Sequence, residues 1–219
     1  MCYSAESSIN NYGLGMLLSL GLYTLGNNYD KHFAFFIFVV IQIQLAEYFM
    51  WKDQKCGIMN KIATISANIL LLLQPFSLLF GGYLFNTLNV SNFLLLGISI
   101  PYLLIGLLII IYRFYNDKKQ ICSRAPDGYL IWFWNNHNFF EKSLLRDFFY
   151  FLYFLLSIIP WLYLKNFNSG FIIFLLIFGS LLIHSFYHNR QNEWQTKWCY
   201  YTVNGVLLYI LYRIVSSYI

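Results

Sequence analysis

NFLLLGISIPYLLIGLLIIIYRF, residues 92–114, contains a single charged side chain, Arg113, close to its end. A helix needs about 20 mostly apolar residues to cross the hydrocarbon core of a bilayer, which is about 30 Å thick. The stretch meets this length, and it lacks the alternation over about ten residues that marks a barrel strand. Because lipid offers no hydrogen-bond partner to free backbone groups, the stretch predicts a membrane-spanning α-helix.

Six further stretches share this apolar character. They cover residues 10–28, 33–51, 62–85, 147–164, 168–188 and 198–217. We therefore predict an all-α fold, a polytopic membrane protein in which residues 1–219 form one seven-transmembrane-helix bundle.

The composition agrees with this fold class. Hydrophobic residues make up 59% of the chain and charged residues 11%, with a mean hydropathy of +0.55, whereas soluble domains carry about 25% charged residues. A soluble chain of 219 residues cannot bury so much apolar surface, so the lipid bilayer is the expected partner. The net charge of +5 is modest and spread over several loops, which argues against a nucleic-acid binder.

The distribution of basic residues predicts the orientation, since cytoplasmic loops are enriched in Lys and Arg. Most of the 14 Lys and Arg residues lie in the connections after the second, fourth and sixth predicted spans. Only Lys31, Lys165 and Arg213 fall on the other side. The first ten residues hold no basic residue, so we expect the first apolar stretch to be retained rather than cleaved. We predict a multi-pass integral membrane protein with its N-terminus in the cytoplasm and its C-terminus on the opposite side.

One connection, residues 115–146, is much longer than the others. Its second part, YLIWFWNNHNFF, is too short to span a bilayer and is rich in aromatic residues. Trp side chains favour the headgroup region. The pattern predicts an interfacial segment with Trp132 and Trp134 at headgroup level, and a plain aromatic anchor is the simpler alternative.

The second predicted span contains an acidic residue, Glu47, within IQIQLAEYFMW. Gln44 lies three residues before it and Trp51 four residues after it, so the three side chains share one helix face. An ionisable residue inside a span is costly and is by default a functional candidate. Glu47 is therefore predicted to bind a proton, an ion or a small ligand. A protonated or hydrogen-bonded structural carboxyl is the alternative.

A second cluster, HSFYHNRQNEWQTKWC, closes the sixth predicted span and opens the seventh. His184 and His188 are four residues apart, so on a helix they face the same way and can bind one metal ion. Glu193 and Cys199 lie close in sequence, and the predicted topology places Cys2 on the same side. The cluster predicts a site for a divalent metal such as zinc. A hydrogen-bonded His pair without metal is the alternative.

Two further predictions follow from cysteine and lysine positions. All four cysteines, Cys2, Cys56, Cys122 and Cys199, fall on the predicted cytoplasmic side, where thiols stay reduced. No pair has CxxC spacing, so we expect free thiols rather than disulfides. The seventh predicted span has no Lys in its middle, so retinal bound through a Schiff base is not expected. The sequence leaves open whether copies of the chain form a homo-oligomer.

Several short motifs occur in an order that resembles a known family. These motifs are MCYSAESS at the start, Gln44–Glu47–Trp51, Gln74–Pro75, the stretch from Gly128 to Trp134, and Trp198–Cys199. The family comprises small seven-span membrane proteins of unknown function in bacteria, eukaryotes and large DNA viruses. Its members begin Met-Cys-x-Ser or Met-Cys-Ser, carry a Gln-x-x-Glu-Gly-x-x-Trp-like motif in the second span, and have Trp-Cys at the start of the last.

This resemblance covers nearly the whole chain, although Tyr48 stands where the family motif commonly has Gly. The family brings no activity with it. The resemblance adds Trp198 to the candidates for a ligand-binding site, and the matched motif positions are Cys2, Glu47, Trp51, Trp198 and Cys199.

Three functions remain open at this point. The first is binding or transport of a proton, metal ion or small ligand through a polar site at the cytoplasmic ends of spans two, six and seven. The second is a zinc-dependent membrane hydrolase acting on lipid, since His184 and His188 resemble a His pair of seven-span lipid amidases. The matching Ser-x3-His in an early span is missing, however. The third is a structural or assembly protein without a ligand.

Overall fold

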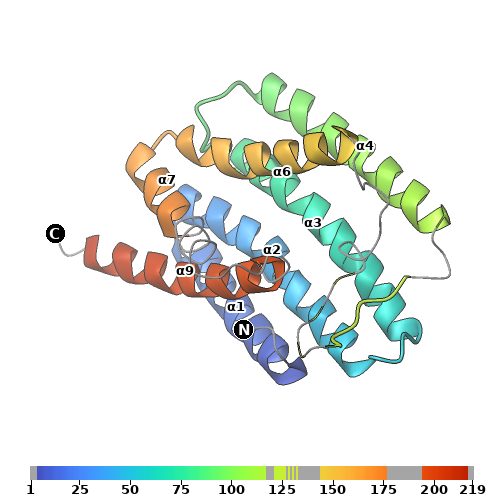
Figure 1. Ribbon diagram of the computed structural model, residues 1–219. Coiled ribbons are helices and arrows are strands. Elements are labelled where there is room, and N and C mark those ends of the chain that lie inside the picture. The colour runs from blue at the N-terminus through green and yellow to red at the C-terminus, as the bar shows by residue number, and fades with distance from the viewer. Residues whose placement is uncertain are drawn as a thin grey trace.

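The computed structural model describes residues 4–116, 121–126, 128, 130, 132, 144–176 and 194–216. The described chain is helical, with one isolated antiparallel bridge between Leu88 and Leu164. Figure 1 shows the helices, which are α1 (Ala5–Leu25), α2 (Asn28–Lys52), α3 (Ile58–Leu84), α4 (Asn92–Asn116), α6 (Leu144–Leu162), α7 (Phe167–Phe174) and α9 (Trp194–Ser216). The all-α prediction is confirmed for these residues.

Three of these helices are long and apolar enough to cross a membrane: α2, α3 and residues 92–112 of α4. They overlap the predicted spans at 33–51, 62–85 and 92–114. The other predicted spans overlap α1, α6, α7 and α9, which do not meet the same criterion over the described residues. The prediction for 168–188 also extends beyond the described residues. The structure therefore supports membrane association through three helices.

The outward faces of α1, α4 and α9 are apolar and exposed. Leu108, for example, is 67% exposed in the isolated chain. Exposed apolar surface of this kind is unfavourable in water and is typical of a face that contacts lipid tails. The exposed apolar side chains include Leu14, Leu17, Leu20, Leu94, Ile98, Leu104, Leu108, Ile111, Leu207, Leu208, Leu211 and Ile214.

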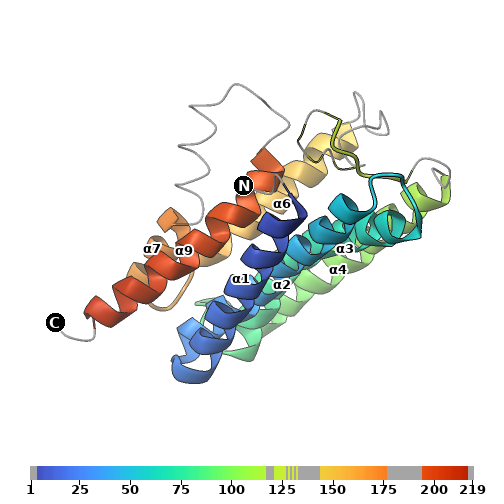
Figure 2. The same ribbon diagram turned by 90° about the horizontal axis from the view of Figure 1, so that it is seen from below.

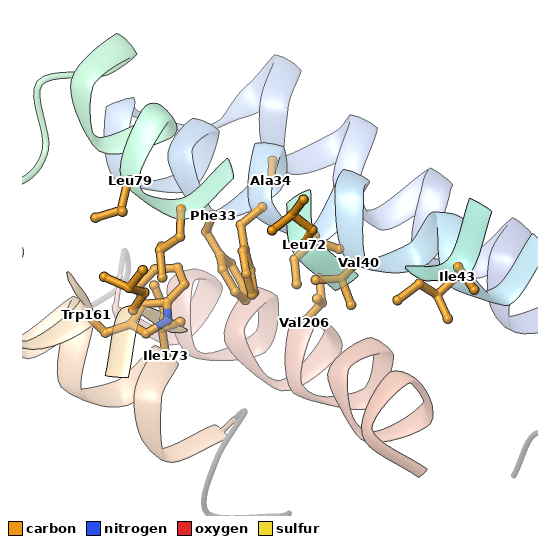
Figure 3. Close-up of a cluster of buried hydrophobic side chains, with 14 of the residues drawn as sticks. Phe33, Ala34, Val40, Ile43, Leu72, Leu79, Trp161, Ile173 and Val206 are labelled. Atoms are coloured by element: carbon orange, nitrogen blue, oxygen red, sulfur yellow. The ribbon is translucent and has the colours of Figure 1, made fainter. Parts of the chain in front are cut away.

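Helix α2 is the central element. It packs against α1 and α3 on two sides, and α9 also contacts it. Figure 3 shows Phe33 and Val40 of α2 facing Val206 of α9, with Trp161 of α6 and Ile173 of α7 at one end of the cluster. All five side chains are buried. Helix α4 packs on α3, away from α2.

The start of α2 is specified by a capping box. The Asn27 side chain accepts hydrogen bonds from the backbone N–H groups of Tyr29 and Asp30, and the Asp30 carboxylate accepts the N–H of Asn27. Such reciprocal bonds satisfy backbone donors that a helix start otherwise leaves without a partner. The preceding turn is tight, because a Cβ at Gly26 would lie 2.3 Å from the Cβ of Asp30. The sequence thus fixes the position at which α1 ends and α2 begins.

The bundle has two chemically different ends, which Figure 2 separates. The basic end holds the start of α1, the turn 53–57 between α2 and α3, the described part of 121–132 and the starts of α6 and α9. The opposite end holds the α1–α2 turn, the α3–α4 and α6–α7 connections and the end of α9. At this opposite end, Asn89 N–H donates to Tyr163 O at 2.7 Å and Lys165 N–H donates to Thr87 O at 2.8 Å.

At the basic end, the segment that follows α4 docks onto the start of α3. The Asn60 side chain donates to Ser123 O at 2.7 Å and accepts the N–H of Ser123 at 2.9 Å. The hydroxyl groups of Thr64 and Ser123 are 2.9 Å apart, and Ala125 N–H donates to Gln54 Oε1 at 2.8 Å. A buried amide that satisfies a loop backbone in both directions fixes the position of that loop.

A disulfide joins Cys56 of the α2–α3 turn to Cys122 of the docked segment, with 5.4 Å between their Cα atoms. The prediction of free thiols is therefore wrong for these two residues. The two cysteines are 66 positions apart, so no local spacing signals the bridge. The disulfide can form because α3 and α4 run antiparallel, so that the segment after α4 returns to the basic end, where α3 begins.

The Trp132 side chain is only 2% exposed and packs against the core. Its place at headgroup level stays a prediction. Ile121 and Leu130 of the same segment are buried as well. The docked backbone turns these apolar side chains inward. Trp134 lies outside the described residues.

We expect Cys56→Ser to lower the free energy of unfolding by about 2–4 kcal/mol, because the bridge restrains a long loop in the unfolded chain. Chemical unfolding in detergent without reductant measures this loss. The Cys56→Ser/Cys122→Ser double variant should lose no more than either single variant. An unfolding midpoint that is unchanged by reductant in the wild type would contradict the prediction.

Candidate functional site

Gln44 and Glu47 lie on the face of α2 that also carries Phe33 and Val40, and both are completely buried. Gln44 Nε2 donates a hydrogen bond to Glu47 Oε2 at 3.0 Å. The predicted sharing of one helix face by these two side chains is therefore confirmed. A carboxyl group buried in an apolar bundle is costly unless it is protonated, paired or ligand-bound.

Two polar residues of α1 lie level with this pair. The antiparallel register of α1 and α2 is set by Ser19 Oγ donating to Ala34 O at 2.7 Å and by Gln42 Nε2 donating to Met16 Sδ at 3.4 Å. Extending this register at about 1.5 Å per residue brings Asn11 level with Glu47. Ser8, one turn earlier, is then level with the last turn of α2.

Three buried polar atoms in this region have no hydrogen-bond partner in the described structure: Ser8 Oγ, Asn11 Nδ2 and Trp51 Nε1. Buried polar groups are nearly always paired, so three such atoms within about one helical turn of one another along the bundle need an explanation. We group Ser8, Asn11, Gln44, Glu47 and Trp51 as the Glu47 site, because the other four residues lie within about one helical turn of Glu47 along the bundle axis. The group holds two N–H donors, a hydroxyl and a carboxyl, the kinds of group that bind a species able both to donate and to accept hydrogen bonds.

Of the other predicted site residues, only Trp198 and Cys199 lie within the described backbone. Trp198 and Cys199 lie in the first turns of α9, which start at the basic end (Figure 2), but their side chains are outside the described set. His184, His188, Glu193 and Cys2 lie outside the described residues altogether. Among the residues that are described, no three His, Cys, Asp or Glu side chains gather closely enough to hold a metal ion. The zinc site remains a prediction.

A second buried polar cluster, at the opposite end, was not predicted from the sequence. Asp30 is 3% exposed and accepts a hydrogen bond from Tyr209 at 2.8 Å. Arg213 contacts both of its oxygens, through Nε and Nη2 at 3.2 Å each. We call this set the Asp30 lock. Since Tyr209 and Arg213 belong to α9, the lock ties the end of α9 to the start of α2.

His32 lies two residues after Asp30 and is completely buried. Its Nε2 is 2.7 Å from Leu78 O, and its Nδ1 is 2.7 Å from Thr87 Oγ1. Because a carbonyl oxygen can only accept, Nε2 carries the proton, and Nδ1 of the neutral ring accepts from the Thr87 hydroxyl. The ring stacks on Trp161, with centroids 5.7 Å apart. His32 therefore connects α2 to α3, to the α3–α4 connection and to α6.

Close packing around His32 requires glycine at one position. A Cβ at Gly81 would lie 2.6 Å from His32 Cδ2. With both ring nitrogens engaged and no open side, His32 is a structural connector rather than a ligand-binding group. The sequence offered two signals for this region, the capping box at Asn27–Asp30 and a histidine inside an apolar run.

Comparison with protein-family models, curated proteins and solved structures finds no match to this chain. The resemblance suggested by the motif order therefore remains a prediction. The functional argument rests on the residues of this chain alone.

We expect Asp30→Asn to lower the free energy of unfolding by about 1–3 kcal/mol, because it removes the charge opposite Arg213. Breaking a fully buried pair costs about 3–5 kcal/mol, but Arg213 is 36% exposed and solvent screens the loss. Tyr209→Phe should cost about 1 kcal/mol. Thermal unfolding of the two single variants and the double variant measures the coupling. Strictly additive effects would contradict a shared carboxylate.

Proposed function

We propose that this chain is a seven-span membrane protein that binds a proton or a small cationic solute at the Glu47 site and passes it across the bilayer. The observation that supports the proposal most directly is the complete burial of Glu47 within about one helical turn of three buried polar atoms that have no partner among the described residues. A protein that used Glu47 only for packing would be expected to satisfy those atoms.

The chemistry of the site favours a cation or a proton over an anion. The carboxyl group of Glu47 carries the site's only ionisable charge among Ser8, Asn11, Gln44, Glu47 and Trp51. An ionised carboxylate in an apolar bundle is stabilised by proton uptake or by a bound cation. The N–H donors of Asn11 and Trp51 can then hold an acceptor atom of the solute, such as a hydroxyl or water oxygen.

The position of the site within the bundle supports a role in passage across the membrane. Glu47 lies on the α2 face shared with Val40, which faces α9, and α9 contacts both α1 and α2. The site is nearer to the basic end, which the positive-inside pattern assigns to the cytoplasm. At the opposite end, the Asp30 lock joins α2 to α9, and His32 joins α2 to α3 and α6.

The Asp30 lock and the His32 contacts favour a second candidate, a purely structural function. Asp30 and His32 show that this chain uses buried polar side chains to join helices. Glu47 with Gln44 would then be one more connector of that kind. The two candidates differ in whether changing Glu47 alters binding or only stability.

The deciding experiment compares wild type, Glu47→Gln and Glu6→Gln in liposomes that contain a trapped pH dye. Glu6 is an exposed carboxyl of α1, so the control makes the same chemical change away from the site. Proton flux is driven by a potassium gradient with valinomycin. Cation binding is followed separately, as a shift in the unfolding temperature with metal chlorides and small ammonium salts.

We expect Glu47→Gln to reduce flux or ligand-induced stabilisation to background, while Glu6→Gln behaves as the wild type. If wild type shows neither flux nor a shift, the transport proposal fails. If Glu47→Gln changes only the unfolding temperature and leaves every binding readout as in the wild type, the structural candidate replaces it.

A further inference from the structure

A groove of about 540 Å³ lies between α2 and α3 on the outside of the bundle. The small side chains of Ala46, Ala63 and Ser66 line it and leave room between the two helices. Larger apolar side chains complete its walls. The lining residues are Gln42, Leu45, Ala46, Phe49, Met59, Ile62, Ala63, Ser66, Ile69 and Leu70.

The groove runs along the helices rather than into the core. Its α3 residues recur from Met59 to Leu70, a rise of about 16 Å along the helix axis. It therefore starts at the basic end and reaches toward the middle of the bundle. Met59 and Ile62 are 48% and 58% exposed, so the described helices leave this face open. In a bilayer, such a face meets lipid tails.

Exposed positive charge lies at the basic end of the groove. Lys52 follows Phe49 by one helical turn, and Lys55 lies in the α2–α3 turn. Lys52 Nζ sits 5.6 Å from the centre of the Tyr48 ring, a pairing typical of the headgroup level. The nearby Asp53 carboxylate is directed elsewhere, since it accepts the N–H groups of Gly57 and Asn60.

We propose that this groove binds one acyl chain of an anionic phospholipid whose phosphate is held by Lys52 and Lys55. The shape supports the choice of an extended hydrocarbon chain, since the lining is almost wholly apolar and the volume falls within the range of small-molecule sites, about 300–1,000 Å³. The two lysines select the negative headgroup. This site is separate from the Glu47 site and does not depend on it.

The test measures lipid retention by native mass spectrometry of the full chain in detergent, after addition of phosphatidylglycerol or phosphatidylcholine. Lys52→Gln/Lys55→Gln removes the proposed headgroup contacts. Lys61→Gln is the matched control, because helical periodicity places Lys61 on the far side of α3 from Met59 and Ser66. Ser66→Phe fills the groove.

The control for bulk is Gly97→Phe on the exposed face of α4, where an added side chain meets open space. We expect wild type to retain one phosphatidylglycerol in preference to phosphatidylcholine. Affinity should fall about fivefold for each of the two lysines removed. Ser66→Phe should abolish retention, while Lys61→Gln and Gly97→Phe should retain lipid as the wild type does.

Three results would overturn the proposal. One is the absence of any retained lipid in the wild type. Another is equal retention of the two lipids with no effect of Lys52→Gln/Lys55→Gln. The last is equal loss of lipid in the Lys61→Gln control. If Ser66→Phe does not fold, the lysine variants still decide the question, because both side chains are exposed and outside the packed core.

Discussion

The burial of α2 is the constraint on which the rest of this structure depends. A helix enclosed by protein inside a bilayer has no water to solvate a polar side chain, so each such group must find a partner within the bundle. Asp30, His32, Gln44 and Glu47 all lie on α2 and are all buried. All four are hydrogen-bonded. Asp30 bonds Tyr209 and Arg213, His32 bonds Leu78 and Thr87, and Gln44 bonds Glu47. Asp30 joins α2 to α9, and His32 joins α2 to α3 and α6.

The two ends of the bundle join neighbouring segments through different interactions. At the opposite end, α9 is joined to α2 by the charged Asp30 lock, and α3 and α6 are joined through the neutral ring of His32. At the basic end, the contacts are between a loop and a helix, through Asn60 and the Cys56–Cys122 bridge. The Glu47 site lies between these regions. Within the part of the chain that the structure describes, Ser8 Oγ, Asn11 Nδ2 and Trp51 Nε1 have no hydrogen-bond partner there.

The helical class and three membrane-spanning lengths could be predicted from the sequence, because apolar runs such as 92–114 carry that information locally. The shared face of Gln44 and Glu47 followed from helical periodicity in the same way. The Cys56–Cys122 bridge, the inward position of Trp132 and the Asp30 lock could not be predicted. Each depends on which distant segments the folded chain brings together, and one sequence does not encode those pairings in any local pattern.

The disulfide has a consequence for how the protein has to be produced and handled. The predicted orientation would put its end of the bundle in a reducing compartment, yet a bridge between Cys56 and Cys122 needs an oxidant. Protein from cells that keep this face reduced would therefore start with an unlinked loop, and it would gain the bridge only on exposure to air or glutathione disulfide. Preparations of identical sequence would then differ in heat resistance according to their purification buffer. The redox history of a sample thus becomes a variable that every measurement on this chain has to record.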